Sequence, residues 1–313
     1  MAPVIETEGL TRLYAPQRGI EDLNLSIPRG EIFGYLGPNG AGKTTTIRLL
    51  MGYIRARKGQ LRLFGENAGA GSVALRRRIG YLPGELGFHE AFTGDRALRF
   101  YEKLSGVPAV HRDWLCTQLR FTPSDRRRRI GVYSKGMKQK LGIIQALQHD
   151  PELLILDEPT TGLDPLVQEA FYDILHELRD RGKTIFFSSH VLAEVQRLCD
   201  RVGVVKDARL VLNTTMSEMA NRADRLLWVK LKESESNGSI VEAGNVPPIA
   251  KARFIRATGG GWLLYLAAPQ DSARIVNELA RLQPLDFRFE PAVEEAFLKL
   301  YGVTLKNRSV ESR

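Results

Sequence analysis

GPNGAGKT, the stretch at residues Gly37–Thr44, decides the fold of this chain. It matches the pattern G-x-x-x-x-G-K-[ST] of a phosphate-binding loop at every fixed position. The apolar run Ile32–Leu36 before it predicts a buried strand, and the apolar spacing over Thr45–Met51 after it predicts a helix. A glycine loop between a strand and a helix lets backbone N–H groups and the positive helix N-terminus meet phosphate oxygens. The three elements together predict a nucleotide site.

All of this loop is expected to lie against the phosphates of a nucleotide. The candidate binding residues are Gly37, Pro38, Asn39, Gly40, Ala41, Gly42, Lys43, Thr44 and the next residue, Thr45. The lysine is placed to reach the β- and γ-phosphates, and the hydroxyl of Thr44 to ligate Mg²⁺. The alternative, a glycine-rich turn with an unrelated lysine, would not need the strand and the helix that flank it.

A pair of acidic residues follows a second apolar run. Leu153–Leu156 is apolar throughout, as in a strand that lies inside a parallel sheet, and Asp157 and Glu158 follow it directly. With a phosphate-binding loop upstream, Asp157 is expected to hold Mg²⁺ from the side opposite Thr44. Glu158 is placed to polarise the attacking water. The alternative is an acidic pair that merely ends a strand.

His190 follows a third apolar segment, Thr184–Ser188, which is expected to form the strand next to Leu153–Leu156. That position would bring the imidazole near the γ-phosphate, to which it could donate a hydrogen bond. A lone histidine after a strand is more often structural, so both interpretations stay open.

Composition limits the classes of protein that fit. The chain has 313 residues, 43% of them hydrophobic and 26% charged, which is ordinary for a globular protein of about two domains. No apolar run approaches the roughly 20 residues that span a bilayer. The N-terminus lacks the features of a signal peptide, so a cytosolic location is expected. Only Cys116 and Cys199 are present, so no disulfide framework is implied.

The net charge of +9 allows a negatively charged partner, either nucleic acid or the inner face of a membrane. Two arginine runs contribute to it, Arg76–Arg78 and Arg126–Arg129, and they fit a solvated helix face equally well. The sequence has no basic patch interleaved with aromatic residues, of the kind that stacks single-stranded bases.

The remaining pattern predicts an α/β protein with two additions. Val4–Tyr14, Leu23–Ile27 and Leu61–Phe64 are expected to form a small antiparallel sheet beside the phosphate-loop strand. Helical spacing from about residue 86 to residue 150 predicts an inserted helical subdomain. Strands and helices then alternate, as in a mainly parallel sheet. We expect one domain over residues 1–215 and a small α+β domain over residues 216–313.

A further short segment completes a recognisable set. YSKGM, residues Tyr133–Met137, opens a predicted helix. In order, GPNGAGKT, YSKGM and LLILDEPTTGLD (Leu153–Asp164), with His190 downstream, resemble the nucleotide-binding subunits of ATP-binding cassette (ABC) transporters, in particular the ABC-2 or multidrug-exporter type. The resemblance covers about residues 4–215. It implies a P-loop NTPase (RecA-like) core with an antiparallel β subdomain and a helical subdomain, followed by a small α+β C-terminal domain.

The resemblance also implies that two copies share a site. In this family two cassettes pair head to tail around two ATP molecules, and the signature segment of one, here YSKGM, faces the phosphate loop of the other. Ser134, also the expected cap of its helix, and Gly136 would contact the γ-phosphate held by the partner. Asp164 would lie at the dimer interface. Tyr14 matches the aromatic residue that stacks on adenine, with an ordinary strand aromatic as the alternative.

By the same resemblance the chain is expected to be an ATPase, using ATP and Mg²⁺, that powers a membrane exporter. Glu158 would act as general base, while Lys43 and His190 would stabilise the transferred phosphoryl group. Separate permease subunits and a second ABC subunit, identical or paralogous, are the expected partners, at the cytoplasmic face of the cell membrane.

Two other functions are weighed against this one. A soluble ABC-type ATPase acting on nucleic acid or ribosomes is allowed by the positive charge. The single cassette without a long coiled-coil insertion argues against it, and no nucleic-acid partner is expected. Glu158 and His190 argue against a nucleotide-binding switch without turnover.

Three positions depart from the family pattern. Lys135 and Met137 stand where relatives commonly have glycine and glutamine, although the two expected phosphate contacts of the segment are kept. Gly84 stands where relatives usually have a glutamine that senses Mg²⁺ and the membrane partner. Glu85 is a candidate substitute that would reach the metal.

The C-terminal domain resembles a small domain found on some exporter cassettes. Support of the dimer, regulation and simple stabilisation of the chain are all compatible with it. Strands are expected over Trp228–Leu231, Phe254–Ala257 and Trp262–Ala267, and helices over Ser272–Leu282 and Val293–Tyr301.

Overall fold

The computed structural model shows a chain of two compact units, divided after Met216. The structure describes residues 2–68, 73–222, 225–230, 252–258, 261–266, 275, 277, 279–281, 284–291 and 297. Among these residues, no helix is both long enough and apolar enough to cross a bilayer.

The N-terminal strands form an antiparallel sheet in the order β2-β1-β4-β5. Its strands are β1 (Ile5–Ala15), β2 (Arg18–Ile27), β4 (Lys58–Leu63) and β5 (Glu66–Asn67). Leu23, Leu25 and Ile27 are buried, whereas Asn24 and Ser26 between them are exposed. The alternation in the sequence thus becomes the inner and outer face of the sheet. The predicted antiparallel sheet is confirmed, and the two-residue β5 is an addition to it.

A six-stranded mixed sheet has the order β10-β9-β3-β8-β7-β6. Its strands are β3 (Ile32–Leu36), β6 (Ile79–Leu82), β7 (Leu153–Asp157), β8 (Thr184–Ser189), β9 (Arg201–Lys206) and β10 (Arg209–Thr215). All neighbours pair in parallel except β10, which is antiparallel to β9. Leu36 pairs with Ser189, and Asp157 with Ser188. The carboxyl ends of β3, β7 and β8 therefore meet at one edge, where open parallel sheets bind ligands.

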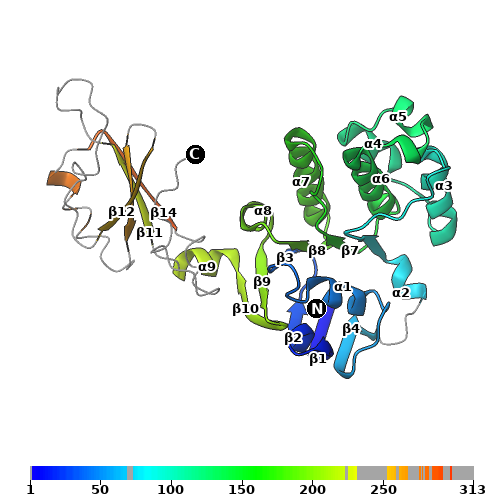
Figure 1. Ribbon diagram of the computed structural model, residues 1–313, viewed down its shortest axis with the longest axis horizontal. Coiled ribbons are helices and arrows are strands. Elements are labelled where there is room, and N and C mark those ends of the chain that lie inside the picture. The colour runs from blue at the N-terminus through cyan, green and yellow to red at the C-terminus, as the bar shows by residue number, and fades with distance from the viewer. Residues whose placement is uncertain are drawn as a thin grey trace. The chain divides into compact units, whose positions relative to one another are not determined.

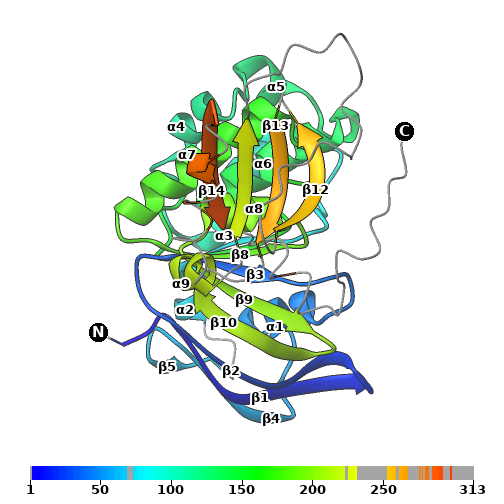
Figure 2. The same cartoon turned by 90° about the vertical axis from the view of Figure 1, so that its left-hand side faces the viewer.

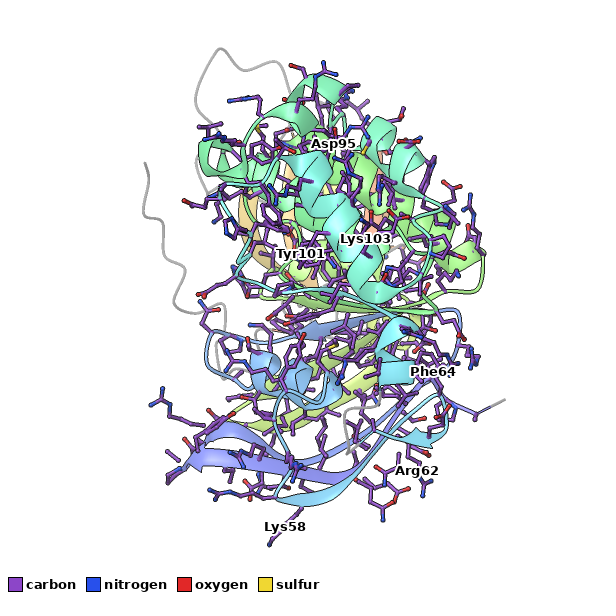
Figure 3. All side chains as sticks on the ribbon, turned by 90° about the vertical axis from the view of Figure 1, so that its right-hand side faces the viewer. Lys58, Arg62, Phe64, Asp95, Tyr101 and Lys103 are labelled. Atoms are coloured by element: carbon purple, nitrogen blue, oxygen red, sulfur yellow. The ribbon has the colours of Figure 1, made fainter. Side chains whose placement is uncertain are left out.

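Helices cover the mixed sheet and form the predicted helical insertion. They are α1 (Lys43–Leu50), α2 (Val73–Arg77), α3 (Gly94–Ser105), α4 (Arg112–Gln118), α5 (Pro123–Arg127), α6 (Lys135–Leu147), α7 (Pro165–Asp180) and α8 (Leu192–Leu198), with a 3₁₀ helix at Ile130–Val132. Within the insertion α3 and α4 pack on α6. Figure 3 shows this side of the unit, with Asp95, Tyr101 and Lys103 along α3.

Strand β3 joins the layers of the first unit because its side chains alternate. The rings of Phe33 and Tyr35 pack with that of Phe186 on one face of the sheet. Gly34 faces the other layer, where a Cβ would lie 2.7 Å from the side chain of Val195 on α8. Figure 1 shows α1 and the antiparallel sheet on one side of the mixed sheet, with α6, α7 and α8 on the other. The phosphate-binding loop leaves β3 at the boundary between these layers.

The second unit contains an antiparallel sheet in the order β12-β13-β11-β14, whose arrows lie side by side in Figure 2. Its strands are β11 (Arg225–Lys230), β12 (Ala252–Thr258), β13 (Gly261–Leu266) and β14 (Asp286–Pro291), and α9 (Met216–Arg222) precedes them. Three of these strands match the predicted segments, and β14 was not predicted. The described residues of Ser272–Leu282 are helical. The helix expected over Val293–Tyr301 lies outside the described residues apart from Phe297.

Candidate nucleotide site

The phosphate-binding loop joins the end of β3 to the start of α1, as its sequence predicts. Gly42 occupies the N-cap position of α1 with a φ of 118°, in the region that favours glycine. A Cβ on Gly42 would lie 2.2 Å from the carbonyl oxygen of Gly19, and one on Gly37 would lie 2.6 Å from that of Val205. The two glycines therefore allow the loop to fold tightly over the sheet edge, with the N-terminus of α1 at its end.

Lys43 is held inside the loop rather than extended into solvent. Its side chain is only 6% exposed. Its Nζ donates to the carbonyl oxygens of Gly37 at 2.7 Å and Pro38 at 3.3 Å. Burial lowers the pKa of Lys43, and the carboxylates of Glu158 and Asp157 oppose that shift. The loop thus presents a buried cation next to the two acidic residues.

Asp157 ends β7 and faces the start of α1. Its Oδ1 accepts a hydrogen bond from Ser188 Oγ at 2.8 Å, and its Oδ2 lies 3.4 Å from Thr44 Oγ1. The residue is 5% exposed, and burial, together with the charge of Glu158, raises the pKa of Asp157. A buried carboxylate beside a hydroxyl offers the hard oxygen donors that suit Mg²⁺. Among the described residues there is no cluster of three His, Cys, Asp or Glu side chains that could hold a metal.

Glu158, the residue after Asp157, has a φ of 49°, a backbone conformation that residues other than glycine rarely adopt. Its N–H donates to the carbonyl oxygen of Ser188 at 3.1 Å, which fixes it to β8. Its Oε1 lies 3.1 Å from His190 Nδ1 and 3.7 Å from Lys43 Nζ. One carboxylate oxygen therefore meets both the histidine after β8 and the lysine of the phosphate loop.

The signature segment begins α6 and packs on the loop that follows Glu158. Ser134 is the N-cap, and its Oγ accepts from the N–H of Met137 at 3.2 Å, so the predicted cap is confirmed. A Cβ on Gly136 would lie 2.8 Å from the carbonyl oxygen of Gly162, and the stem of Lys135 covers the same glycine. Among the described residues, no hydrogen bond or ion pair joins Ser134 to the phosphate-binding loop. The expected contacts of this segment with phosphate stay a prediction.

The roles expected of Tyr14 and Asp164 stay predictions, and the structure shows the surroundings of both residues. Tyr14 on β1 is 55% exposed, and the guanidinium carbon of Arg12 lies 5.3 Å from its ring centroid. Asp164 caps α7, and its Oδ1 accepts from the N–H of Val167 at 3.0 Å. An exposed aromatic face and a loop carboxylate are both open to a ligand or a partner.

The structure separates the two candidates near position 84. A Cβ on Gly84 would lie 3.4 Å from Asp157 Oδ2, so this position borders the proposed metal ligand. Glu85 is exposed, and no hydrogen bond or ion pair of Glu85 is found among the described residues. Coordination of a metal by Glu85 stays a prediction.

Two residues that the sequence patterns did not single out belong to the site. Ser188 holds Asp157 through its hydroxyl. Gln139 on α6 donates from Nε2 to the carbonyl oxygen of Pro159 at 2.6 Å and so ties the signature helix to the loop after the acidic pair. The register of two neighbouring parallel strands was the signal that could have found Ser188. No local pattern points to Gln139.

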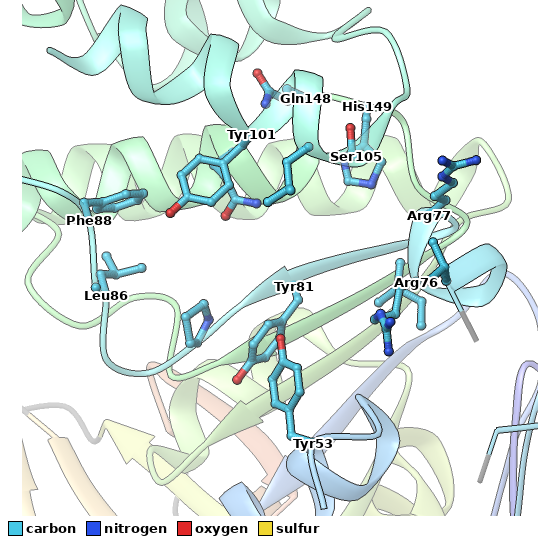
Figure 4. A pocket seen from close by; sticks show the side chains of 16 residues that line it. Tyr53, Arg76, Arg77, Tyr81, Leu86, Phe88, Tyr101, Ser105, Gln148 and His149 are labelled. Carbon is cyan, nitrogen blue, oxygen red and sulfur yellow. The ribbon is translucent and has the colours of Figure 1, made fainter. Parts of the chain in front are cut away.

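A pocket of about 550 Å³ lies apart from the nucleotide residues, between β6 and the helices α2, α3 and α6. Figure 4 shows Arg76 and Arg77 at one end and Leu86 and Phe88 at the opposite end. The ring of Phe88 packs edge to face on that of Tyr101, 6.0 Å between centroids. The pocket is therefore mainly aromatic and aliphatic, with a basic end.

Comparisons with known proteins find one family and several similar ATP-binding proteins. The family model described as ABC transporter matches residues 20–161. The bacitracin transport ATP-binding protein BcrA of Bacillus licheniformis is 38% identical over 242 residues, covering 77% of this chain and 78% of that protein. The daunorubicin/doxorubicin resistance ATP-binding protein DrrA of Streptomyces peucetius is 31% identical over 325 residues, covering 98% and 95%. The Nod factor export ATP-binding protein I of Ralstonia nicotianae is 31% identical, covering 97% and 96%.

Solved structures are similar as well. The structure of an ATP binding subunit of an ABC transporter superposes with a TM-score of 0.65 at 30% identity, covering 70% of this chain and 92% of that one. A dimeric bacterial ABC transporter cassette gives a TM-score of 0.62 at 20% identity, covering 68% and 98%. At 20% identity, the similarity to the dimeric cassette shows a shared fold alone.

Proposed function

The chain belongs to the ABC transporter family, as an ATP-binding subunit of the exporter type that hydrolyses ATP, and we propose that Lys43, Asp157, Glu158 and His190 form its hydrolytic site. One observation carries the proposal. Glu158 Oε1 lies within 3.1 Å of His190 Nδ1 and 3.7 Å of Lys43 Nζ, beside the pair of Asp157 and Thr44. A base, a cation and metal-binding oxygens are thereby gathered at one sheet edge.

The phosphates are bound by the loop and its lysine. Backbone N–H groups and the N-terminus of α1 bind the phosphate oxygens. The buried side chain of Lys43 supplies a positive charge next to these oxygens. Thr44 and Asp157 are the residues that would hold Mg²⁺, which offsets the charge of the β- and γ-phosphates when bound. Both contributions grow in a site that excludes water, because electrostatic attraction is stronger there.

Glu158 acts as general base in this proposal. Its carboxylate accepts a proton from the water that attacks the γ-phosphate, and such assistance contributes about 10²–10⁴ in rate. His190, hydrogen-bonded to the same carboxylate, fixes its orientation and faces the transferred group. Lys43 stabilises the charge that develops on the phosphoryl oxygens.

Substitution of the base tests the proposal. Glu158→Gln keeps the size of the side chain, so ATP binding is expected to persist while hydrolysis falls by about 10²–10⁴. Phosphate release and binding of a fluorescent ATP analogue measure the two properties separately. Glu177→Gln on α7, where the carboxylate pairs with Arg181 at the surface, is the matched control and should hydrolyse at the parent rate. Turnover by Glu158→Gln at the parent rate would remove Glu158 from this role.

The active form is a dimer, with ATP between two cassettes. Subunits of this family dimerise, and the proposed arrangement places Ser134 and Gly136 of one copy on the γ-phosphate held by the other. Their position at the start of α6, without a contact to the phosphate loop of their own chain among the described residues, supports this. ATP would contact both cassettes and would therefore bind the closed dimer more tightly than the separated subunits. Hydrolysis removes this difference in affinity, so the dimer reopens.

Subunits of this family pair with membrane permeases, and the pocket of Figure 4 is the proposed docking place for one. Its lining residues Tyr53, Val73 and Leu104 are exposed although they are large and apolar. Contiguous apolar surface of this kind marks an interaction site. The loop 83–88 forms one wall, next to Gly84 and hence to the proposed metal site. A permease held here would sense the nucleotide through that wall.

The proposed location is the cytoplasmic face of the cell membrane, through the permease. The net charge of +9 suits the anionic inner leaflet. The relatives are named for bacitracin transport, for daunorubicin/doxorubicin resistance and for Nod factor export, which supports transport over action on nucleic acid.

A further inference from the structure

The carboxylate of Glu194 on α8 accepts hydrogen bonds from three different segments of the first unit. Its Oε1 accepts from Thr160 Oγ1 at 2.7 Å and from Gln168 Nε2 at 3.1 Å. Its Oε2 accepts from Ser189 Oγ at 2.6 Å. The two hydroxyl bonds fall in the short range of charge-assisted O–H···O⁻ hydrogen bonds. A single side chain therefore joins elements that are 5 to 34 residues away from it in the sequence.

Two of the three donors are close in the sequence to a residue of the proposed catalytic site, and the third lies on α7. Thr160 lies two residues after Glu158, in the loop that leads to α7. Ser189 immediately precedes His190 and is 2% exposed. Gln168 lies in the first turns of α7, the helix that Asp164 caps. Glu194 is thus linked to the general base, to the histidine and to the helix that starts at the expected dimer interface.

No ion pair of Glu194 is found among the described residues, and its charge is offset by the three neutral donors and by the N-terminus of α8, in whose first turn it lies. The nearest basic residue along α8, Arg197, pairs with Glu169 instead. Glu194 is half-buried. Removing a donor from a carboxylate costs more free energy than removing an average hydrogen bond, because the bond is to a charged group.

The loop after Glu158 is held from its other side by the signature helix. Gln139 donates to the carbonyl oxygen of Pro159, and Thr160, the next residue, donates to Glu194. Glu158 itself is tied to β8 through its N–H and keeps its φ of 49° between these anchors. Since such a φ is unfavourable for glutamate, the surrounding contacts must maintain it.

We propose that Glu194 is a positioning residue that keeps Glu158 and His190 in register by clamping the 159–163 loop to the segment before His190. The inference rests on the proposed function, because it assigns Glu194 a purpose only if Glu158 and His190 act in hydrolysis. Glu194 touches neither nucleotide nor water in this role. It acts through Thr160 on one side and through Ser189 on the other.

Thr160 offers the sharpest test because its hydroxyl can be removed with little change of volume. Thr160→Val is expected to lower kcat for ATP about tenfold, the cost of a lost hydrogen bond to a charged group, with KM for ATP within about twofold. Thr160→Ser keeps the hydroxyl and should recover most of the parent kcat. The lost hydrogen bond should lower the melting temperature of Thr160→Val by only a few degrees, while that of Thr160→Ser should stay close to the parent value. Glu177→Gln again serves as the surface control.

A double-mutant cycle separates positioning from general support of the fold. Glu194→Gln keeps the shape but offers only one acceptor oxygen, so kcat should fall in the parent background. In the His190→Ala background the same change should lower kcat less than it does in the parent, because only one of the two groups that Glu194 positions, Glu158, remains. Additive losses in the cycle would overturn the inference, as would a KM and a melting temperature that change together with kcat.

The outcomes also distinguish this inference from the proposed function. If Glu158→Gln abolishes turnover while Thr160→Val and Glu194→Gln hydrolyse ATP like the parent, only the positioning role fails. If Glu158→Gln itself turns over ATP normally, the assigned base fails and the inference falls with it.

Discussion

Gly84 borders the carboxylate that is proposed to hold Mg²⁺. A Cβ on this residue would lie 3.4 Å from Asp157 Oδ2 and 3.6 Å from its Cγ, which is ordinary contact. Position 84 therefore accepts a side chain, and a long polar one would run along the Asp157 carboxylate. Glycine offers no side-chain oxygen there, so position 84 would add no ligand to a metal held by Asp157.

Gly84→Gln is expected to supply the missing oxygen. The concentration of Mg²⁺ that gives half-maximal ATP hydrolysis should fall several-fold, because one more hard ligand is offered to the ion. Gly84→Ala, which adds only the Cβ, should leave that concentration unchanged. Glu85→Gln completes the set, since a rise in the required Mg²⁺ would identify Glu85 as a ligand. An unchanged Mg²⁺ requirement in Gly84→Gln would contradict the position assigned to residue 84.

At the residue scale, the sequence identifies site residues whose role depends on their neighbours in the chain, and it misses those whose role depends on contacts between distant segments. The phosphate loop and the pair Asp157 and Glu158 follow apolar runs directly, so their environment can be inferred from neighbours in the chain. Ser188 and Glu194 carry no such signal. Ser188 reaches Asp157 only through the register of β7 and β8, and the donors to Glu194 are brought together only by the packing of α7 and α8.

At the scale of elements, an ion pair between Arg78 and Glu152 connects the starts of β6 and β7. Arg78 donates to both oxygens of Glu152, from Nε at 2.6 Å and from Nη2 at 3.0 Å. Arg29 adds a bond of 3.1 Å from the segment before β3, and Arg78 also stacks on Phe64, which Figure 3 labels. The hydrogen bonds from Arg78, helped by Arg29, lower the pKa of Glu152 from 4.5 to about 2.

The ion pair of Glu152 and Arg78 makes the free energy of unfolding depend on pH. Because the folded pKa of Glu152 is below its unfolded value, the stabilisation is complete above about pH 4.5 and is lost as the pH falls toward 2. Glu152→Gln should lower the free energy of unfolding by about 1 kcal/mol at pH 7, a figure reduced by solvent screening of a carboxylate that is 41% exposed. The difference between parent and variant should shrink at pH 3.

Denaturant unfolding at the two pH values measures this difference. Glu66→Gln is the control, because Glu66 faces the same Arg78 at 3.5 Å but is 63% exposed and should matter little. A difference between parent and Glu152→Gln that is the same at pH 7 and pH 3 would contradict the assigned ion pair.

Elements with a long apolar pattern were predictable, and short or irregular ones were not. β3 and β7 follow from the continuous apolar runs Ile32–Leu36 and Leu153–Leu156, and α6 follows from helical spacing. α2 and α5 have five residues each, and β5 has two, which is too short for a period to show. β10 and β14 are edge strands of their sheets, and their place depends on the strand beside them rather than on their own composition.

At the scale of the whole molecule, one chain supplies only part of the proposed site. The phosphate loop, the metal-binding oxygens and Glu158 are gathered at one sheet edge, and Ser134 is presented at the start of α6 without reaching them in the same chain. In the proposed dimer, Ser134 of a second cassette completes the arrangement at the nucleotide. Sequence alone suggested this through resemblance, since no pattern within one chain describes a contact between two.

A mixing experiment tests this claim most directly. Lys43→Ala removes the phosphate grip of one copy, and Ser134→Asp keeps a good helix cap while it places a negative charge against the partner's γ-phosphate. Each variant alone should be nearly inactive in ATP hydrolysis. In a mixed dimer, Lys43 of the Ser134→Asp copy faces Ser134 of the Lys43→Ala copy, so one site is whole.

An equimolar mixture should therefore recover about a quarter of the parent rate, because about half of the dimers are mixed and each of these has one complete site of two. A mixture that is no more active than the average of the two separate variants would contradict a site shared between two copies.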